Sequence, residues 1–117
     1  MTRIIFSETF LKKLKKLKLS ENTITNLISK IPNTKLAIKI DDFANFQVYK
    51  WYLNSKKIRI IILLQKVNNT YIPVSIFKKE TKQWYNLTKE TYQKYCLSDI
   101  EKTIADYKSK KFKEIIL

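Results

Sequence analysis

The sequence contains no glycine and no histidine, and its single cysteine is Cys96. Without glycine the chain cannot form the phosphate loop of nucleotide hydrolases or the dinucleotide-binding turn of Rossmann enzymes, because both need a backbone without Cβ atoms near the ligand. Without histidine it cannot form a Ser-His or Cys-His nucleophile pair, and one cysteine supports neither a disulfide nor a structural zinc site. We therefore expect Cys96 to be a small, buried apolar residue.

Long apolar segments are absent as well. The longest apolar run, Ile60 to Leu64, has the length of a strand and is far shorter than the ~18 residues of a membrane span. The apolar segment near the N-terminus ends at Ser7, and it is too short for the hydrophobic region of a secretory signal. With no repeat, linker or break in composition, the sequence predicts one soluble, cytoplasmic domain over residues 1–117.

Lysine is the residue in excess. Lys and Arg total 24 against 10 Asp and Glu, a formal net charge of +14, and the only arginines are Arg3 and Arg59. Residues 1–33 carry five excess positive charges and residues 34–82 carry seven, whereas residues 83–117 carry two. This imbalance favours a polyanionic partner, either nucleic acid or an anionic membrane surface, through electrostatic steering and counterion release.

The N-terminal part of the chain predicts a short strand followed by two helices. Residues 3–6 are strand-like, and Ser7 can cap a helix whose apolar residues from Phe10 to Leu17 fall on one stripe among lysines. Ser20 can cap a second helix with the same period, which Pro32 ends. Two helices joined so closely are expected to form a hairpin.

From Lys35 the apolar period changes to two, which predicts strands. The expected strands are 36–40, 46–53, 57–67 and 71–79, with turns at Asn54-Ser55 and Asn68-Asn69-Thr70. Residues 58–64 are apolar on both faces apart from Arg59, which predicts a central strand covered by helices on one side. Pro73 predicts that its own strand lies at an edge or contains a bulge.

The pattern becomes helical again after Thr88, a possible N-cap, and Ser98 can cap a second helical piece. The order of elements is therefore β-α-α-β-β-β-β-α. It predicts an α+β domain in which an antiparallel sheet of about four to five strands carries an N-terminal helical hairpin and a C-terminal helix.

Arg59 is the first candidate for a functional residue. In a chain whose usual cation is lysine, an arginine inside a central strand suggests a planar, permanently charged fork for a phosphate group. The alternative is a salt bridge or an aliphatic stem lying along the sheet. Cations and aromatics on the neighbouring strands could hold single-stranded RNA by phosphate contacts and stacking, although the tryptophans could equally pack in the core or in a protein interface. The predicted RNA-binding residues are Lys56, Lys57, Lys78, Lys82, Trp51 and Trp84.

Four features together resemble the RelE/ParE superfamily of toxins from bacterial type II toxin-antitoxin systems. They are the order of elements, the lysine-rich first helix at residues 10–17, Ile58-Arg59-Ile60-Ile61 and Ile76-Phe77-Lys78-Lys79. The resemblance covers residues 3–95. It implies the RelE branch, whose members are ribosome-dependent mRNA endoribonucleases that inhibit translation. No cofactor or metal is implied, and the implied partners are a cognate antitoxin protein, mRNA and the ribosome, without a membrane.

The catalytic residues implied by the resemblance are Lys50, Arg59, Lys79 and Tyr85. Metal-free cleavage by the RNA's own 2′-hydroxyl needs a base, charge stabilisation at phosphorus and an acid for the leaving oxygen. Arg59 and Lys79 would stabilise the phosphate, Tyr85 would position or activate the 2′-hydroxyl and stack on the substrate, and Lys50 would transfer a proton or supply charge. Lys79 replaces an arginine of the family pattern, which keeps the charge but loses the bidentate fork.

Other functions remain open at this point. A ParE-like chain would share the fold and inhibit DNA gyrase instead of cutting RNA. A non-catalytic module would bind nucleic acid with the same basic face. A metal-dependent nuclease would have to use Asp41, Asp42 and Glu80, which lie at separated positions, and the helix at residues 8–18 could bind a membrane surface.

Overall fold

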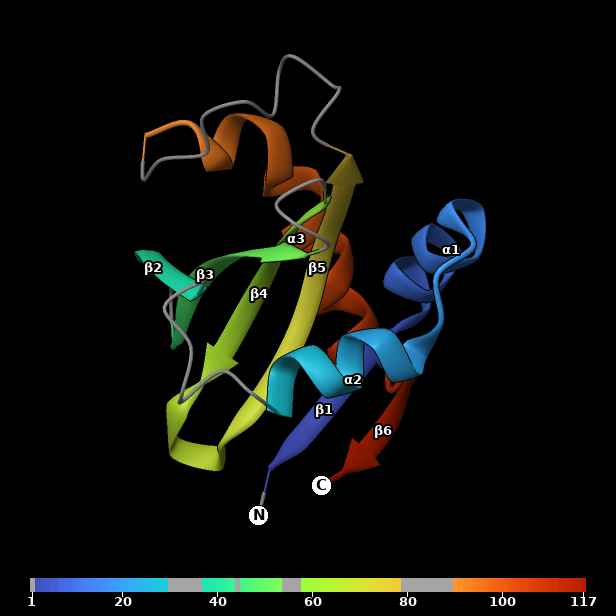
Figure 1. Ribbon diagram of the computed structural model, residues 1–117. Coiled ribbons are helices and arrows are strands. Elements are labelled where there is room, and N and C mark those ends of the chain that lie inside the picture. The colour runs from blue at the N-terminus through green and yellow to red at the C-terminus, as the bar shows by residue number, and fades with distance from the viewer. Residues whose placement is uncertain (1, 30–36, 44, 54–57, 79–89) are drawn as a thin grey trace.

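The computed structural model describes residues 2–29, 37–43, 45–53, 58–78 and 90–117 (Figure 1). It is an α+β domain, which is the predicted class. The elements in chain order are β1 (Arg3–Ser7), α1 (Glu8–Leu17), α2 (Glu21–Ser29), β2 (Ala37–Phe43), β3 (Phe46–Leu53), β4 (Ile58–Gln65), the short 3-10 helix η2 (Lys66–Asn68), β5 (Thr70–Lys78), α3 (Tyr92–Lys108) and β6 (Phe112–Ile116).

The sheet is mixed and has six strands in the order β2-β3-β4-β5-β1-β6, so the predicted antiparallel sheet of about four to five strands is wrong in part. Strands β2 to β5 do form the expected antiparallel meander. The difference arises at the other edge, where β1 runs parallel to β5 and β6 returns antiparallel to β1.

Both N-terminal helices begin with the predicted caps. The Ser7 hydroxyl accepts a hydrogen bond from the Phe10 amide at 3.1 Å, and Ser20 accepts one from the Thr23 amide at 3.2 Å. At the other end of the molecule α3 is one continuous helix, so the expected break at Ser98 is wrong. Thr88 lies outside the described residues. None of the helices within the described ranges is long and apolar enough to cross a membrane.

Helices cover both faces of the sheet, whereas the sequence predicted cover on one side of β4. Figure 1 shows α2 in front of the sheet and α3 behind it. Ile60 and Ile62 of β4 pack with Phe10, Leu14 and the apolar side of α2. Ile61 and Leu63 point the other way and belong to the cluster that contains Tyr92, Cys96 and Ile100 of α3. The burial of Cys96 is confirmed.

Pro73 lies on an interior strand, because β5 has β4 on one side and β1 on the other. The edge placement is therefore wrong, but the expected bulge is present: the register shifts where Ile61 faces Ser75 and Ile62 faces Pro73. The turn before β5 is also as predicted, since Asn69 adopts a left-handed conformation with φ of 48°. The other predicted turn, Asn54-Ser55, lies outside the described residues.

Candidate functional site

Lys50 and Arg59 lie on neighbouring strands and on the same face of the sheet. Lys50 of β3 is opposite Ile61, and Tyr52 is opposite Arg59 of β4. Because successive side chains of a strand point to opposite faces, Lys50 and Arg59 are diagonal neighbours, at a typical spacing of about 7–8 Å. The structure therefore brings together two of the four predicted catalytic residues.

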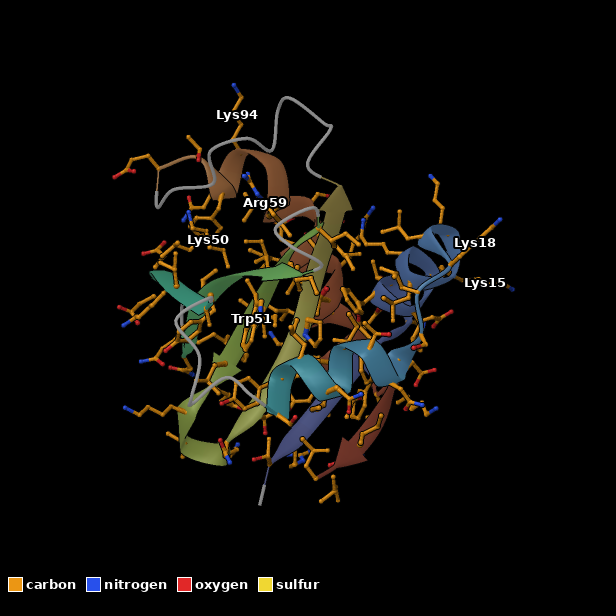
Figure 2. All side chains as sticks on the ribbon, in the orientation of Figure 1. Lys15, Lys18, Lys50, Trp51, Arg59 and Lys94 are labelled. Atoms are coloured by element: carbon orange, nitrogen blue, oxygen red, sulfur yellow. The ribbon has the colours of Figure 1, made fainter. Side chains whose placement is uncertain are left out.

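The face that carries this pair is the one covered by α3. Ile61, two positions beyond Arg59, packs in the cluster with α3. Figure 2 places Lys50 and Arg59 beside the first turns of that helix, on the opposite side of the view from Lys15 and Lys18 of α1. Lys50 is partly exposed and Arg59 is 8% exposed. Both side chains make interactions with the rest of the chain.

The burial of Arg59 sets its electrostatic character. A guanidinium group is a planar cation, so β4 holds a largely buried positive charge, and the cross-strand neighbours of Arg59 are Tyr52 and Phe77. Coulombic interactions are stronger there than in water, because the surrounding side chains lower the effective dielectric constant. An anion that reached the Arg59 guanidinium would gain this stronger attraction but would also lose its own hydration there.

A carboxylate and a tyrosine adjoin the pair, and sequence reasoning did not identify their contact. Asp41 of β2 is opposite Val48, which makes it a diagonal neighbour of Lys50, so Asp41, Lys50 and Arg59 form a row across three strands. The hydroxyl of Tyr92, the first residue of α3, donates a hydrogen bond of 2.6 Å to Asp41 Oδ2. Tyr92 is fully buried, and burial together with this hydrogen bond raises the pKa of Tyr92 to about 12.

Trp51 does not belong to this face. It is opposite Ile60, whose side chain packs on the α1 and α2 side, and it is only 1% exposed. Its indole Nε1 finds no hydrogen-bond partner among the described residues. A base cannot stack on a ring enclosed in this way, so the burial of Trp51 favours the core role that the sequence analysis gave as its alternative to RNA binding.

Of the remaining predicted residues, Lys78 is the one that lies in the described part of the chain. Lys78 ends strand β5 and is opposite Ile58. The following residues lie outside the described part of the chain: Lys56, Lys57, Lys79, Lys82, Trp84 and Tyr85.

Lys94 is a cation that the sequence analysis did not select. It lies in the first turn of α3, is exposed, and is seen in Figure 2 at the same end of the molecule as Lys50 and Arg59. The amino end of a helix is electropositive, so Lys94 adds to the positive potential at this end. The sequence feature that could have identified Lys94 is its position near the start of a predicted helix.

This geometry suits anion binding better than metal binding. No group of three or more His, Cys, Asp or Glu side chains comes together within the described ranges, and the hydrogen bond to Tyr92 occupies one oxygen of Asp41. Comparisons with protein-family models, with curated proteins and with solved structures gave no match.

Proposed function

We propose that the chain is a toxin of a type II toxin-antitoxin system and acts as a ribosome-dependent, metal-independent mRNA endoribonuclease of the RelE type. The observation that carries the proposal is the row of Lys50 and Arg59 on one face of β3 and β4, with Arg59 as a buried, permanent cation. The formal net charge of +14 supports a polyanionic substrate.

In the proposed reaction the 2′-oxygen of RNA forms a bond to the adjacent phosphorus, and the bond from phosphorus to the 5′-oxygen breaks. The products are a 2′,3′-cyclic phosphate and a free 5′-hydroxyl. One group removes the 2′-proton and another protonates the 5′-oxygen as it leaves. Negative charge grows on the phosphate oxygens in the transition state, where a fixed cation in a low-dielectric site is most effective.

Arg59 is the residue best suited to stabilise that charge, because its fork can donate two parallel hydrogen bonds to one phosphate. Lys50, as its diagonal neighbour, supplies a second charge or a proton. The roles proposed for Lys79 and Tyr85, phosphate stabilisation and positioning or activation of the 2′-hydroxyl, come from the family resemblance alone. The proposed partners are a cognate acidic antitoxin, mRNA and the ribosome, in the cytoplasm.

The test is induction of the chain in a bacterial host, with growth and the integrity of translated mRNAs followed together. We expect growth arrest and mRNA cuts from the wild type, and a loss of cleavage of about a hundredfold in Arg59→Ala, the size seen when one transition-state donor is removed. Arg59→Lys keeps the charge without the fork and is expected to retain part of the activity.

The matched control is Lys66→Ala, which removes one exposed cation from η2. It should cut as the wild type does, and circular dichroism should show that every variant is folded. A loss below about tenfold in folded Arg59→Ala would contradict the assignment. Arrest with intact mRNA would point to gyrase or another target. A supercoiling assay would show whether the target is gyrase.

A non-catalytic nucleic-acid-binding module is the second candidate. The observation that favours it is the formal net charge of +14, which suits binding of a polyanion whether or not the chain cuts it. Such a module would bind RNA with an affinity that falls steeply as salt rises and would leave no cleavage product on a gel.

A further inference from the structure

Strand β2 contains a β-bulge, which decides the face of the sheet to which Asp41 belongs. The pairing with β3 shifts between Lys39 and Asp41, so Ile40 is one residue more than β3 can match. Ile40 packs against the cluster that contains α3, and in a regular strand Asp41 would therefore point to the other face. Instead Asp41 is opposite Val48, a member of that same cluster, so the bulge turns the carboxylate toward α3.

The next carboxylate along the chain, that of Asp42, points to the other face. Asp42 is opposite Gln47, which precedes Val48 in β3 and so lies on the side away from α3. There its Oδ1 atom is 3.0 Å from Nζ of Lys39. The sequences of β2 to β5 contain no other Asp or Glu. The bulge therefore leaves one carboxylate on each face of this part of the sheet.

The Asp41 carboxylate is held in place by the first turn of α3. The Tyr92 hydroxyl donates a hydrogen bond of 2.6 Å to Asp41 Oδ2, and it accepts one of 3.3 Å from Gln93 Nε2. Tyr92 is fully buried, so packing fixes the position of this hydroxyl. Because an ionised carboxylate accepts several hydrogen bonds, Asp41 can bind a cation while it is bonded to Tyr92.

The cation next to Asp41 is Lys50. It lies between Asp41 and Arg59, because β3 lies between β2 and β4 and Lys50 is a diagonal neighbour of each. Two cations at this spacing repel each other, and the repulsion is strong where one of them is largely buried, as Arg59 is. A carboxylate on the far side of Lys50 offsets that repulsion. Directly opposite Lys50 on β2 is Ile38, which carries no charge.

Helix α3 brings a second carboxylate to this face, that of Asp99, but it pairs elsewhere. Its Oδ2 atom is 3.2 Å from Nζ of Lys13 and accepts a hydrogen bond of 2.8 Å from the Ser75 hydroxyl. Ser75 belongs to β5, so β4 separates it from Lys50 on β3. Asp41 is therefore the carboxylate that the bulge and α3 place beside Lys50.

We propose that Asp41 is a positioning residue of this site: held by Tyr92, its carboxylate keeps the Lys50 ammonium charged and in a fixed place beside Arg59. Both cations are then available to one phosphate group. An ammonium group has no lone pair to accept the 2′-proton, so Lys50 acts as a cation and not as the base. The consequence for RNA cleavage rests on the proposed function, whereas the placement of Lys50 is measured without cleavage.

The test is to observe the lysine ammonium groups of the isotope-labelled full chain by nitrogen NMR. An ammonium group held by a carboxylate exchanges its protons with water slowly and gives a separate signal, and Lys50→Met identifies that of Lys50. Asp41→Asn keeps an acceptor oxygen for Tyr92 but removes the charge. We expect it to move the Lys50 signal to the position of exposed lysines or to abolish it, and Tyr92→Phe to shift the signal in the same direction.

The matched control is Asp42→Asn, which removes one negative charge from the next residue of the same strand. It should change the signal of Lys39 and leave that of Lys50 in place, because Asp42 points to the other face. A Lys50 signal that Asp41→Asn leaves unchanged would overturn the proposal. Equal changes of that signal in both variants would overturn it as well, since they would reflect net charge and not position.

Binding and cleavage should respond differently to Asp41→Asn. Its affinity for a single-stranded DNA oligonucleotide, which lacks the attacking 2′-hydroxyl, should stay within about threefold of the wild type, because the gain in net positive charge offsets the lost order. Cleavage of mRNA on induction should fall about tenfold, because a displaced cation stabilises the transition state poorly. Asp41→Glu restores the charge and should recover part of the cleavage.

A folded Asp41→Asn variant that cuts mRNA as the wild type does would contradict the positioning role. A wild type that cuts no mRNA would instead refute the proposed function, while the Lys50 signal would still decide whether Asp41 positions this cation. A clamp that only joined β2 to α3 would leave the Lys50 signal unchanged in both Asp41→Asn and Tyr92→Phe.

Discussion

At the scale of single residues, the alternation of side chains along β3 separates Lys50 from Trp51, which the sequence analysis had assigned to one RNA-binding and catalytic surface. Lys50 and Trp51 are consecutive, so in a strand they must point to opposite faces, and only Lys50 can share a face with Arg59. The sequence alone could have predicted that separation, because it follows from the predicted limits of the strand. The contact between Tyr92 and Asp41 was not, because it joins residues 51 positions apart and depends on where α3 packs.

Tyr92 provides a prediction about stability at alkaline pH. The ordinary pKa of tyrosine is 10, and the folded protein raises that of Tyr92 to about 12, so between these values the unfolded chain has lost a proton that the folded chain keeps. This contribution to stability is complete below pH 10 and is lost as pH rises toward 12. We expect the free energy of unfolding of the wild type to fall above about pH 10.

Tyr92→Phe removes this titration and should flatten the fall. At neutral pH the variant should lose about 1.5–3 kcal/mol, because a hydrogen bond to a charged carboxylate disappears. Urea unfolding from neutral pH to about pH 11 measures both effects. Cys96→Ala is a useful comparison, since burial also raises the pKa of the Cys96 thiol to about 12. Equal slopes for Tyr92→Phe and wild type would contradict the role of this hydroxyl.

At the scale of elements, the sequence predicted what short-range patterns determine. The limits of β3 agree with the expected 46–53, and the capping serines of α1 and α2 are in place, because apolar period and side-chain capping are local properties. β6 was missed because its five residues bury little: only Phe112 and Ile115 are partly buried, and its pairing with β1 is decided by tertiary register. The parallel pairing of β1 with β5 is non-local for the same reason.

The absence of glycine has a consequence at the ends of the helices. Lys18, Asn69 and Lys110 adopt positive φ angles of 57°, 48° and 59°, where glycine is the usual residue. A lysine pays a steric cost there because its Cβ approaches the backbone. Lys110 accepts this conformation where the chain leaves α3 for β6.

We therefore expect Lys110→Gly to raise the free energy of unfolding by about 0.5–1 kcal/mol, despite the larger entropy that glycine gives to the unfolded chain. The control is Lys108→Gly inside the last turn of α3, which should lower it by about 1 kcal/mol. Urea unfolding of the two variants measures the contrast. Destabilisation of similar size in both would show that the conformation at Lys110 carries no strain that glycine relieves.

At the scale of the whole molecule, the net charge of +14 acts in opposite directions on folding and on binding. Inside the folded chain the excess lysines repel one another, and salt screens that repulsion over about 10 Å at 0.1 M. Between the chain and a polyanion the same lysines attract, and salt weakens the complex by reducing the gain from counterion release.

Raising the NaCl concentration from about 20 mM to about 300 mM should therefore raise the free energy of unfolding while it lowers the affinity for a single-stranded RNA. Urea unfolding and fluorescence anisotropy over the same salt series measure the two trends. Arg59→Ala should reduce the slope of log affinity against log salt by about one if Arg59 contacts a phosphate, and Lys102→Ala on the outer side of α3 should leave the slope unchanged. A slope that Arg59→Ala does not alter would place RNA on another surface, because a cation that releases no counterion on binding makes no phosphate contact.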